Sequence, residues 1–190
     1  MSAFQFEHHP FWEFSLRVYG NEGVPAACIA LQERRGIDVN LLLFCAWIGE
    51  SGRGVLNGAD LNSALAATTA WNTDIVCAIR AVRDRLKGGM RPIPAERSDA
   101  LRNMILEIEV KCEHLEQIAL TEAVTRPVEE GRSTEQRRDD AVANIVAYFS
   151  DRGFTPDDDD SEQVAIVLAP AFPESDRAAL AQQVRSAAAT

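Results

Sequence analysis

The sequence predicts an all-α protein, and periodicity and composition support this prediction together. Apolar residues at helical spacing, separated by Gly and Pro breakers, account for almost the whole 190-residue chain, whereas the alternating pattern of β-strands is nearly absent. Hydrophobic residues make up 46% and charged residues 25%, which are ordinary values for a chain that builds its own core. We therefore expect short buried N-terminal helices packed on a long antiparallel helical hairpin, with a C-terminal helical extension.

Short helices are expected over residues 10–19, 25–35 and 39–48. Pro10 suits the first turn of a helix, where its missing N–H costs no hydrogen bond. Gly36 can end the second helix in a left-handed conformation, and Asp38 can cap the third. Because residues 39–48 are apolar on every side, this third helix is expected to be the most buried element.

A long helical hairpin is expected between residues 60 and 119. Asp60 can cap its first helix, in which core-type positions recur at steps of four and three: Leu61, Leu65, Thr68, Asn72, Ile75, Ile79, Val82 and Leu86. The second helix repeats this spacing at Leu101, Ile105, Ile108, Cys112, Leu115 and Ala119. Such steps form heptad seams, and the Gly/Pro-rich connection at residues 88–94 turns the chain back. Thr68 and Asn72 either fix the register of the seam or line a pocket, and we favour register.

The composition changes after residue 124. Residues 125–134 are typical of a linker, and they are followed by an amphipathic helix over 135–152, an apolar stretch over 164–168 and a last helix over 174–188. We therefore expect a helical core domain at residues 1–124 and an acidic helical extension at residues 125–190.

The charge and the cysteines restrict the class of protein. A formal net charge of −10 disfavours nucleic acid and anionic membranes as partners, because both attract a positive surface. The longest apolar run, Leu41 to Ile48, is far shorter than the ~20 residues that a membrane-spanning helix requires. The first residues lack the pattern of a signal peptide, so we expect a cytoplasmic protein. Its isolated cysteines are expected to be reduced, buried thiols: Cys28, Cys45, Cys77 and Cys112.

No catalytic, metal or cofactor site is predicted. His114 has no Glu three residues before it, so the Glu-x-x-His pair of di-iron bundles is missing. The acidic residues on the same helix share one stripe, which we interpret as a solvated face: Glu109, Glu113 and Glu116. The acidic run at Asp157–Asp160 lacks the Gly and the distal Glu of a calcium loop. Neither a G-x-S-x-G nucleophile motif nor a G-K-[ST] phosphate loop occurs, so the sequence disfavours an enzyme.

Basic residues gather at the end of the first hairpin helix. Arg80, Arg83 and Lys87 lie on successive turns, and Arg91 follows in the connection, so that the four can converge on one end of the molecule. They form either a docking patch for carboxylate or phosphate groups or a solvated helix end that suits the helix dipole. A third alternative is that the acidic run at Asp157–Asp160 folds back onto them.

The N-terminal half carries a family resemblance. Its motifs are F-W-x-F-S-L-x-V-Y from residue 11, G-V-x-x-A-C-x-x-L-Q from residue 23 and G-x-D-V-N-L-L-L-F from residue 36. Further matches follow along the long helix at Trp71, Ile79, Arg80, Arg83, Leu86 and Lys87. Over about residues 10 to 120 the chain resembles an uncharacterised proteobacterial family of unknown function. The resemblance implies a small cytosolic all-helical protein, with no assigned activity, substrate or cofactor.

Two classes of function follow from these observations. The preferred one is a non-catalytic cytoplasmic interaction protein that docks a protein partner through the basic helix end. The alternative is a binder of a small anionic molecule, or an enzyme that acts on one, with a pocket between the N-terminal helices and the hairpin. The candidate polar groups of that pocket are Gln32, Asp38, Asn40 and Asn72. The sequence indicates no oligomeric state.

Overall fold

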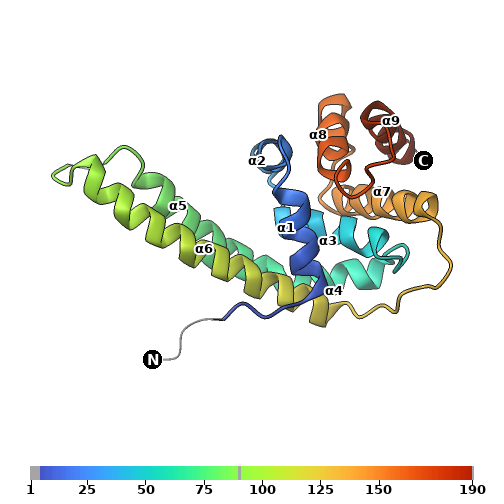
Figure 1. The fold of residues 1–190 in the computed structure, drawn as a ribbon, viewed down its shortest axis with the longest axis horizontal. Coiled ribbons are helices and arrows are strands. Elements are labelled where there is room, and N and C mark those ends of the chain that lie inside the picture. Colours follow the sequence, from blue (N-terminus) through green and yellow to red (C-terminus); the bar gives the residue numbers. More distant parts are fainter. Residues whose placement is uncertain (1–4, 90, 190) are drawn as a thin grey trace.

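The chain forms two regions, a body of packed helices and an arm that projects from it (Figure 1). The structure, a computed structural model, describes residues 5–89 and 91–189. We define the arm as residues 72–89 and 91–110 and the body as the other described residues. The described residues form helices and turns without a β-strand, so the predicted all-α class is confirmed. None of the helices described is both long enough and apolar enough to cross a lipid bilayer.

The N-terminal helices begin and end close to the predicted residues: α1 (Pro10–Tyr19), α2 (Val24–Arg35) and α3 (Val39–Glu50). Gly36 ends α2 with φ at 63°, in the left-handed region that favours glycine. Asp38 caps α3, because its Oδ1 accepts hydrogen bonds from the N–H groups of Asn40 and Leu41. Helix α3 is buried without interruption over residues 40–49, as its apolar sequence predicts.

The predicted hairpin is also present. Its first side consists of α4 (Gly58–Trp71), a π-helical turn η1 (Asn72–Val76) and α5 (Cys77–Arg85), and α6 (Ala95–Ala123) runs back along all of them. Asn57, and not Asp60, caps α4; Asp60 completes the capping box by accepting a hydrogen bond from the Asn57 N–H. The π-helical turn shifts the phase of the helix, so the seam expected to run unbroken to Leu86 is interrupted at Asn72.

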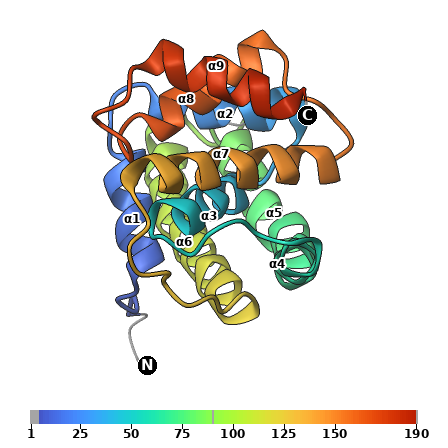
Figure 2. The same cartoon turned by 90° about the vertical axis from the view of Figure 1, so that its right-hand side faces the viewer.

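The last third of the chain forms α7 (Thr134–Asp151), α8 (Asp158–Leu168) and α9 (Arg177–Ala188). Helix α7 lies along α3, α8 packs on α2, and α9 packs on α7 and α8 (Figure 2). Where only an apolar stretch from Val164 was expected, α8 begins six residues earlier, because Asp157 caps it in a capping box with Asp160. The acidic run is therefore the start of a helix.

One hydrophobic core joins the N-terminal helices to α7–α9. Phe44 of α3, Phe149 of α7 and Leu168 of α8 are fully buried in it. A Cβ atom on Gly49 would collide with the backbone of Ala141, so only glycine allows α3 and α7 to approach this closely. Residues on both sides of the boundary predicted between 124 and 125 thus contribute to the same core. The division into two domains stays a prediction.

Candidate functional site

Arg80 joins the arm to the body. Its Nε donates to Glu109 Oε1 at 2.8 Å and its Nη2 to Glu113 Oε1 at 2.7 Å, both on α6. Its Nη1 donates to Gln32 Oε1 of α2 at 2.6 Å. One turn further along α5, Arg83 donates through Nε to Glu109 Oε2 at 2.5 Å. Both guanidinium groups are therefore paired inside the hairpin.

The predicted basic patch is divided between two places. Lys87 and Arg91 are exposed at the tip of the arm, whereas Arg80 and Arg83 are partly buried against α6. The four do not converge as predicted, because buried carboxylates on α6 hold the two arginines within the hairpin. A role of the four residues in partner binding stays a prediction.

The acidic run does not cover the basic end of the hairpin. Asp157 and Asp160 form ion pairs with Arg35 at 2.7 Å and 2.6 Å, and Asp157 also pairs with Arg34 at 2.8 Å. Because Arg34 and Arg35 form the last turn of α2, these contacts fasten α8 to α2 and leave Lys87 and Arg91 untouched.

The acidic stripe of α6 is buried, so its interpretation as a solvated face is wrong. Glu109 is 3% exposed and Glu116 is 1% exposed, while Glu113 is half-buried. The stripe turns inward because Arg80 and Arg83 face it at the spacing of successive helical turns. This match between two acidic positions and two basic ones was the signal in the sequence that could have located the site.

A polar network surrounds Glu116 at the base of the arm. Its Oε2 accepts hydrogen bonds from Asn40 Nδ2 at 2.7 Å and from Asn72 Nδ2 at 3.4 Å. Gln117 Nε2 donates to Asn40 Oδ1 at 2.9 Å. Asp38, the cap of α3, contributes a carboxyl group that is hydrogen-bonded to that of Glu116. Three of the predicted pocket residues thus meet around a glutamate that the sequence analysis had placed at the surface.

The two carboxyl groups share a proton. Burial and, to a smaller extent, the adjacent carboxyl of Asp38 together raise the pKa of Glu116 to about 9. Burial also raises the pKa of Asp38, although hydrogen bonds from Glu116 and from the N–H groups of Asn40 and Leu41 oppose the shift. Glu116 therefore keeps its proton at neutral pH and donates it to the Asp38 carboxylate.

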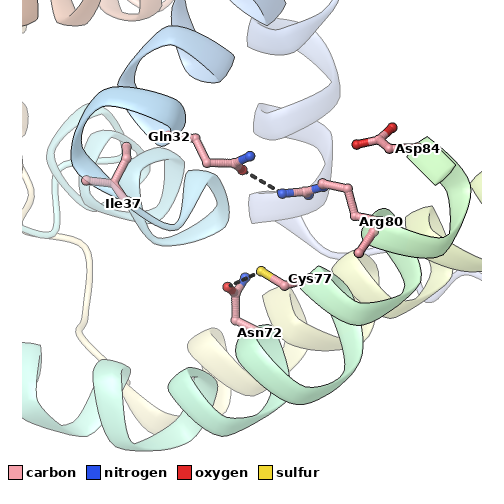
Figure 3. A pocket seen from close by; sticks show the side chains of 8 residues that line it. Gln32, Ile37, Asn72, Cys77, Arg80 and Asp84 are labelled. Carbon is pink, nitrogen blue, oxygen red and sulfur yellow. Dashed lines mark hydrogen bonds between the residues drawn. The ribbon is translucent and has the colours of Figure 1, made fainter.

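A cleft of about 310 Å³ opens between α2 and α5, beside this network (Figure 3). Gln32 and Arg80 reach toward each other across it from the two helices. Its lining consists of Gln32, Gly36, Ile37, Asn72, Cys77, Arg80, Ala81 and Asp84. Of the four predicted pocket residues, Gln32 and Asn72 line the cleft, whereas Asp38 and Asn40 are bound to Glu116. Arg80 was predicted at the tip and lies in the cleft, and Cys77 and Asp84 were not predicted there.

Acidic groups outnumber basic ones around this cleft. The positive charges are those of Arg80 and Arg83, and the acidic groups are Glu109, Glu113, Asp84 and the Asp38–Glu116 pair. Burial raises the pKa of Glu113, and the Arg80 guanidinium opposes that shift. This balance of charge suits a ligand that is neutral overall better than an anion.

The cysteines divide into two groups. Cys28 and Cys45 are buried, as expected, and burial raises the pKa of both thiols. Cys77, in contrast, is exposed at the cleft, where its Sγ donates to Asn72 Oδ1 at 3.4 Å, and Cys112 is partly exposed. Within residues 5–89 and 91–189, no group of His, Cys, Asp and Glu side chains is arranged to hold a metal ion.

A second cavity of about 480 Å³ lies between α3 and the end of α6. In it, the Arg53 guanidinium stacks over the Trp47 ring at 4.4 Å, and burial lowers the pKa of Arg53. Arg126, beside it, donates to Asp60 Oδ2 at 2.6 Å. This cavity was not predicted, because Arg53 lies in the Gly-rich segment at residues 49–54, which carries no recognisable binding motif.

The comparisons with known proteins concern the N-terminal part of the chain. The model of one protein family, described as "Protein of unknown function (DUF2390)", matches residues 10–120. No curated protein and no solved structure matches the chain. The matched residues include α1–α5, most of α6, and every residue of the polar network and the cleft. Because the match covers more than half of the 190 residues, the chain belongs to the DUF2390 family of proteins of unknown function.

Proposed function

We propose that the protein binds a small polar molecule in the cleft between α2 and α5. The observation that supports this proposal is the state of Arg80. Three acceptors fix its guanidinium group, yet each terminal nitrogen retains a second N–H with no acceptor among the described residues. A guanidinium group that the fold already holds in place, and that still has N–H donors to offer, can bind an oxygen atom of a ligand. Little further side-chain entropy is lost on binding, because the group is already ordered.

The ligand class follows from the groups at the two ends of the cleft. Arg80 and the amide nitrogen of Gln32 offer N–H donors, and the exposed carboxylate of Asp84 offers an acceptor. Because acidic groups already outnumber basic ones around the cleft, a ligand with a net negative charge would be repelled. We therefore infer a molecule without net charge that carries an acceptor oxygen and an amino group, such as an amino acid or an amide.

Ligand-observed NMR on the full chain tests this proposal. The probes are mixtures of amino acids, amino-acid amides, simple sugars and dicarboxylates. We expect saturation transfer to the zwitterionic or amide probes, with an affinity about tenfold lower in Gln32→Leu, which removes one donor. Arg85→Gln, an exposed change on the same helix, is the matched control and should bind normally. Binding of dicarboxylates alone, or unchanged binding by Gln32→Leu, would contradict the proposal.

Docking of a partner at the arm tip is a second candidate function. The observation that favours it is that Lys87 and Arg91 are both exposed, in the connection between α5 and α6 that forms the tip of the arm (Figure 1). Projecting cations steer an acidic partner at low salt. The partner would therefore present carboxylate or phosphate groups.

Charge reversal separates this candidate from a solvated helix end. Lys87→Glu with Arg91→Glu should abolish salt-sensitive capture of a partner from native lysate. The matched control is Arg152→Glu with Arg177→Glu, which reverses two exposed charges on the body. Equal capture by wild type, tip variant and control would exclude the tip as a docking site.

A further inference from the structure

The second cavity, between α3 and the end of α6, is lined by basic and neutral side chains only. Its charged lining residues are Arg53 and Arg126, and none of the residues that line it is acidic. The cleft between α2 and α5 shares no lining residue with this cavity and has the opposite balance of charge. In a chain with a formal net charge of −10, the second cavity is therefore a local centre of positive potential. Its volume of about 480 Å³ is sufficient for a small molecule.

Arg53 has hydrogen-bond donors to offer in this cavity. Its guanidinium group lies over the Trp47 ring, 4.4 Å from the ring centre. A contact with the face of a ring uses none of the N–H groups of an arginine. Those of Arg53 have neither an acceptor nor a carboxylate partner among the residues that the structure describes.

The carboxylates around Arg53 are bound to other cations. Glu50, whose charge acts on Arg53, pairs with Arg17 at 3.0 Å. Glu129, next to the turn that carries Arg53, pairs with Arg132 at 2.8 Å. The described part of the chain therefore leaves the charge of Arg53 without an ion pair.

The turn that carries Arg53 is fixed by the fold. Gly52 and Gly54, on either side of it, have φ angles of 75° and 80°, which favour glycine. The Arg53 N–H donates to the Ile48 carbonyl at 3.0 Å, and the Arg53 carbonyl accepts from Arg126 Nε at 2.9 Å. Because this segment is already ordered, little entropy is lost when a ligand binds to it.

Arg126 and His9 supply further donors. Arg126 Nη1 pairs with Asp60 at 2.6 Å, whereas its Nη2 has no acceptor in the described ranges. His9 Nδ1 accepts a hydrogen bond from the Trp12 N–H at 3.2 Å, and burial lowers the pKa of His9, so the neutral ring carries its proton on Nε2. That Nε2 atom is buried and has no hydrogen-bond partner among the described residues. The lining thus holds N–H donors on three side chains and no carboxylate to accept from them.

We propose that this cavity binds a small monocarboxylate with an apolar body. Arg53 and Arg126 are both cationic, and Asp60 neutralises Arg126, so one positive charge remains to be compensated. A carboxylate brings one negative charge and accepts two parallel hydrogen bonds from a guanidinium group, whereas a phosphate group brings nearly two charges. The apolar residues of the lining, which suit the body of the ligand, are Pro10, Trp47, Val124 and Pro127.

Isothermal titration calorimetry on the full chain tests the class of ligand. The probes are benzoate, benzyl alcohol, succinate and inorganic phosphate. Benzyl alcohol has the same ring without the charge, and we expect it to bind at least ~tenfold more weakly than benzoate. Succinate and phosphate lack the ring and carry more charge than the cavity can compensate, so they should also bind more weakly. Binding of any of these three probes as tightly as benzoate would overturn the proposed class.

Two variants test the location. Arg53→Met removes the guanidinium group but keeps an unbranched side chain over Trp47, and it should weaken benzoate binding at least ~tenfold. Arg152→Met, at an exposed position on the body, is its control and should bind normally. Thr125→Glu adds a carboxylate at an exposed residue of the lining and should weaken binding several-fold. Thr125→Gln adds the same bulk without the charge and should bind benzoate normally.

The remaining outcomes also decide the proposal. A wild-type chain that does not bind benzoate at millimolar concentration overturns it, and so does binding that Arg53→Met and Thr125→Glu leave unchanged. Circular dichroism monitors the fold of each variant, and Thr125→Glu decides alone if Arg53→Met unfolds. Gln32→Leu alters only the cleft between α2 and α5 and should bind benzoate normally, so that failure at one site can be distinguished from failure at the other. Weaker benzoate binding by Gln32→Leu would assign the anion to that cleft and refute the proposal.

Discussion

The body and the arm bury opposite kinds of surface. In the body, α3 is apolar on every side and is buried along nearly its whole length. In the arm, α6 buries Glu109 with Arg80 and Arg83, while Leu101 and Met104 remain about half exposed or more. The hydrophobic effect alone is sufficient to place α3, whereas ion pairs decide which side of α6 faces inward. Hydrophobic periodicity therefore identifies the apolar side of a helix, but it does not show whether that side faces the rest of the chain.

The largest difference should come from truncating the apolar core of the body. Phe44 is fully buried beside the rings of Phe11 and Trp47. Phe44→Ala should lower the free energy of unfolding by about 4 kcal/mol, measured by denaturant titration. Leu106→Ala, at an exposed position of α6, is the control and should change it by less than ~0.5 kcal/mol. Similar losses for the two variants would remove the distinction between body and arm.

A smaller loss is expected where the arm buries charge. Arg80→Met leaves Glu109 in its buried position with one guanidinium fewer, at a site where the Arg80 side chain is 22% exposed. We expect the free energy of unfolding to fall by about 2 to 3 kcal/mol, less than for a fully buried pair. Arg85→Met, at an exposed position of α5, should cost only a few tenths of a kcal/mol. An equally small loss for Arg80→Met would show that the ion pairs do not orient α6.

The smallest effect concerns the shared proton, and its size depends on pH. The folded chain holds the Glu116 proton up to a pKa of about 9, whereas the unfolded chain releases it near 4.5. Between these values unfolding releases a proton, so this site makes the protein less stable as the pH rises. Glu116→Gln cannot titrate and should therefore gain stability relative to wild type across this range, on the order of 1 kcal/mol at pH 7.

Thermal unfolding of both proteins at several pH values measures that gain. The control is Glu107→Gln, at an exposed position on the same helix, which should change the free energy of unfolding by less than ~0.5 kcal/mol. A difference for Glu116→Gln that is constant over the range would show that Glu116 is ionised in the folded chain. In that case Asp38 and Glu116 would not share a proton.

Local signals in the sequence were sufficient for the elements, but not for the site. Gly36 and Asp38 act through residues within one helical turn, so the boundaries of α2 and α3 could be predicted. The bonds from Arg80 to Glu109 and to Gln32 join residues that are 29 and 48 positions apart. The matched spacing of the two arginines and the two glutamates indicates only that the hairpin helices can pair there, and nothing in the sequence points to Gln32. The π-helical turn at Asn72 was not predicted either, because it adds a residue to the turn without a distinct sequence pattern.

The contact between α3 and α7 has a practical consequence for anyone who shortens the chain. The family match ends at residue 120, which invites expression of that fragment alone. The Tyr148 hydroxyl of α7 nevertheless accepts a hydrogen bond from the N–H of Asp38 at 2.9 Å, and Ala141 of α7 packs directly against Gly49 of α3. Cutting at residue 120 would expose one whole side of the most apolar helix to water, and such a surface promotes aggregation. A soluble fragment therefore needs to extend through α7 at least, whatever the limits of the matched region.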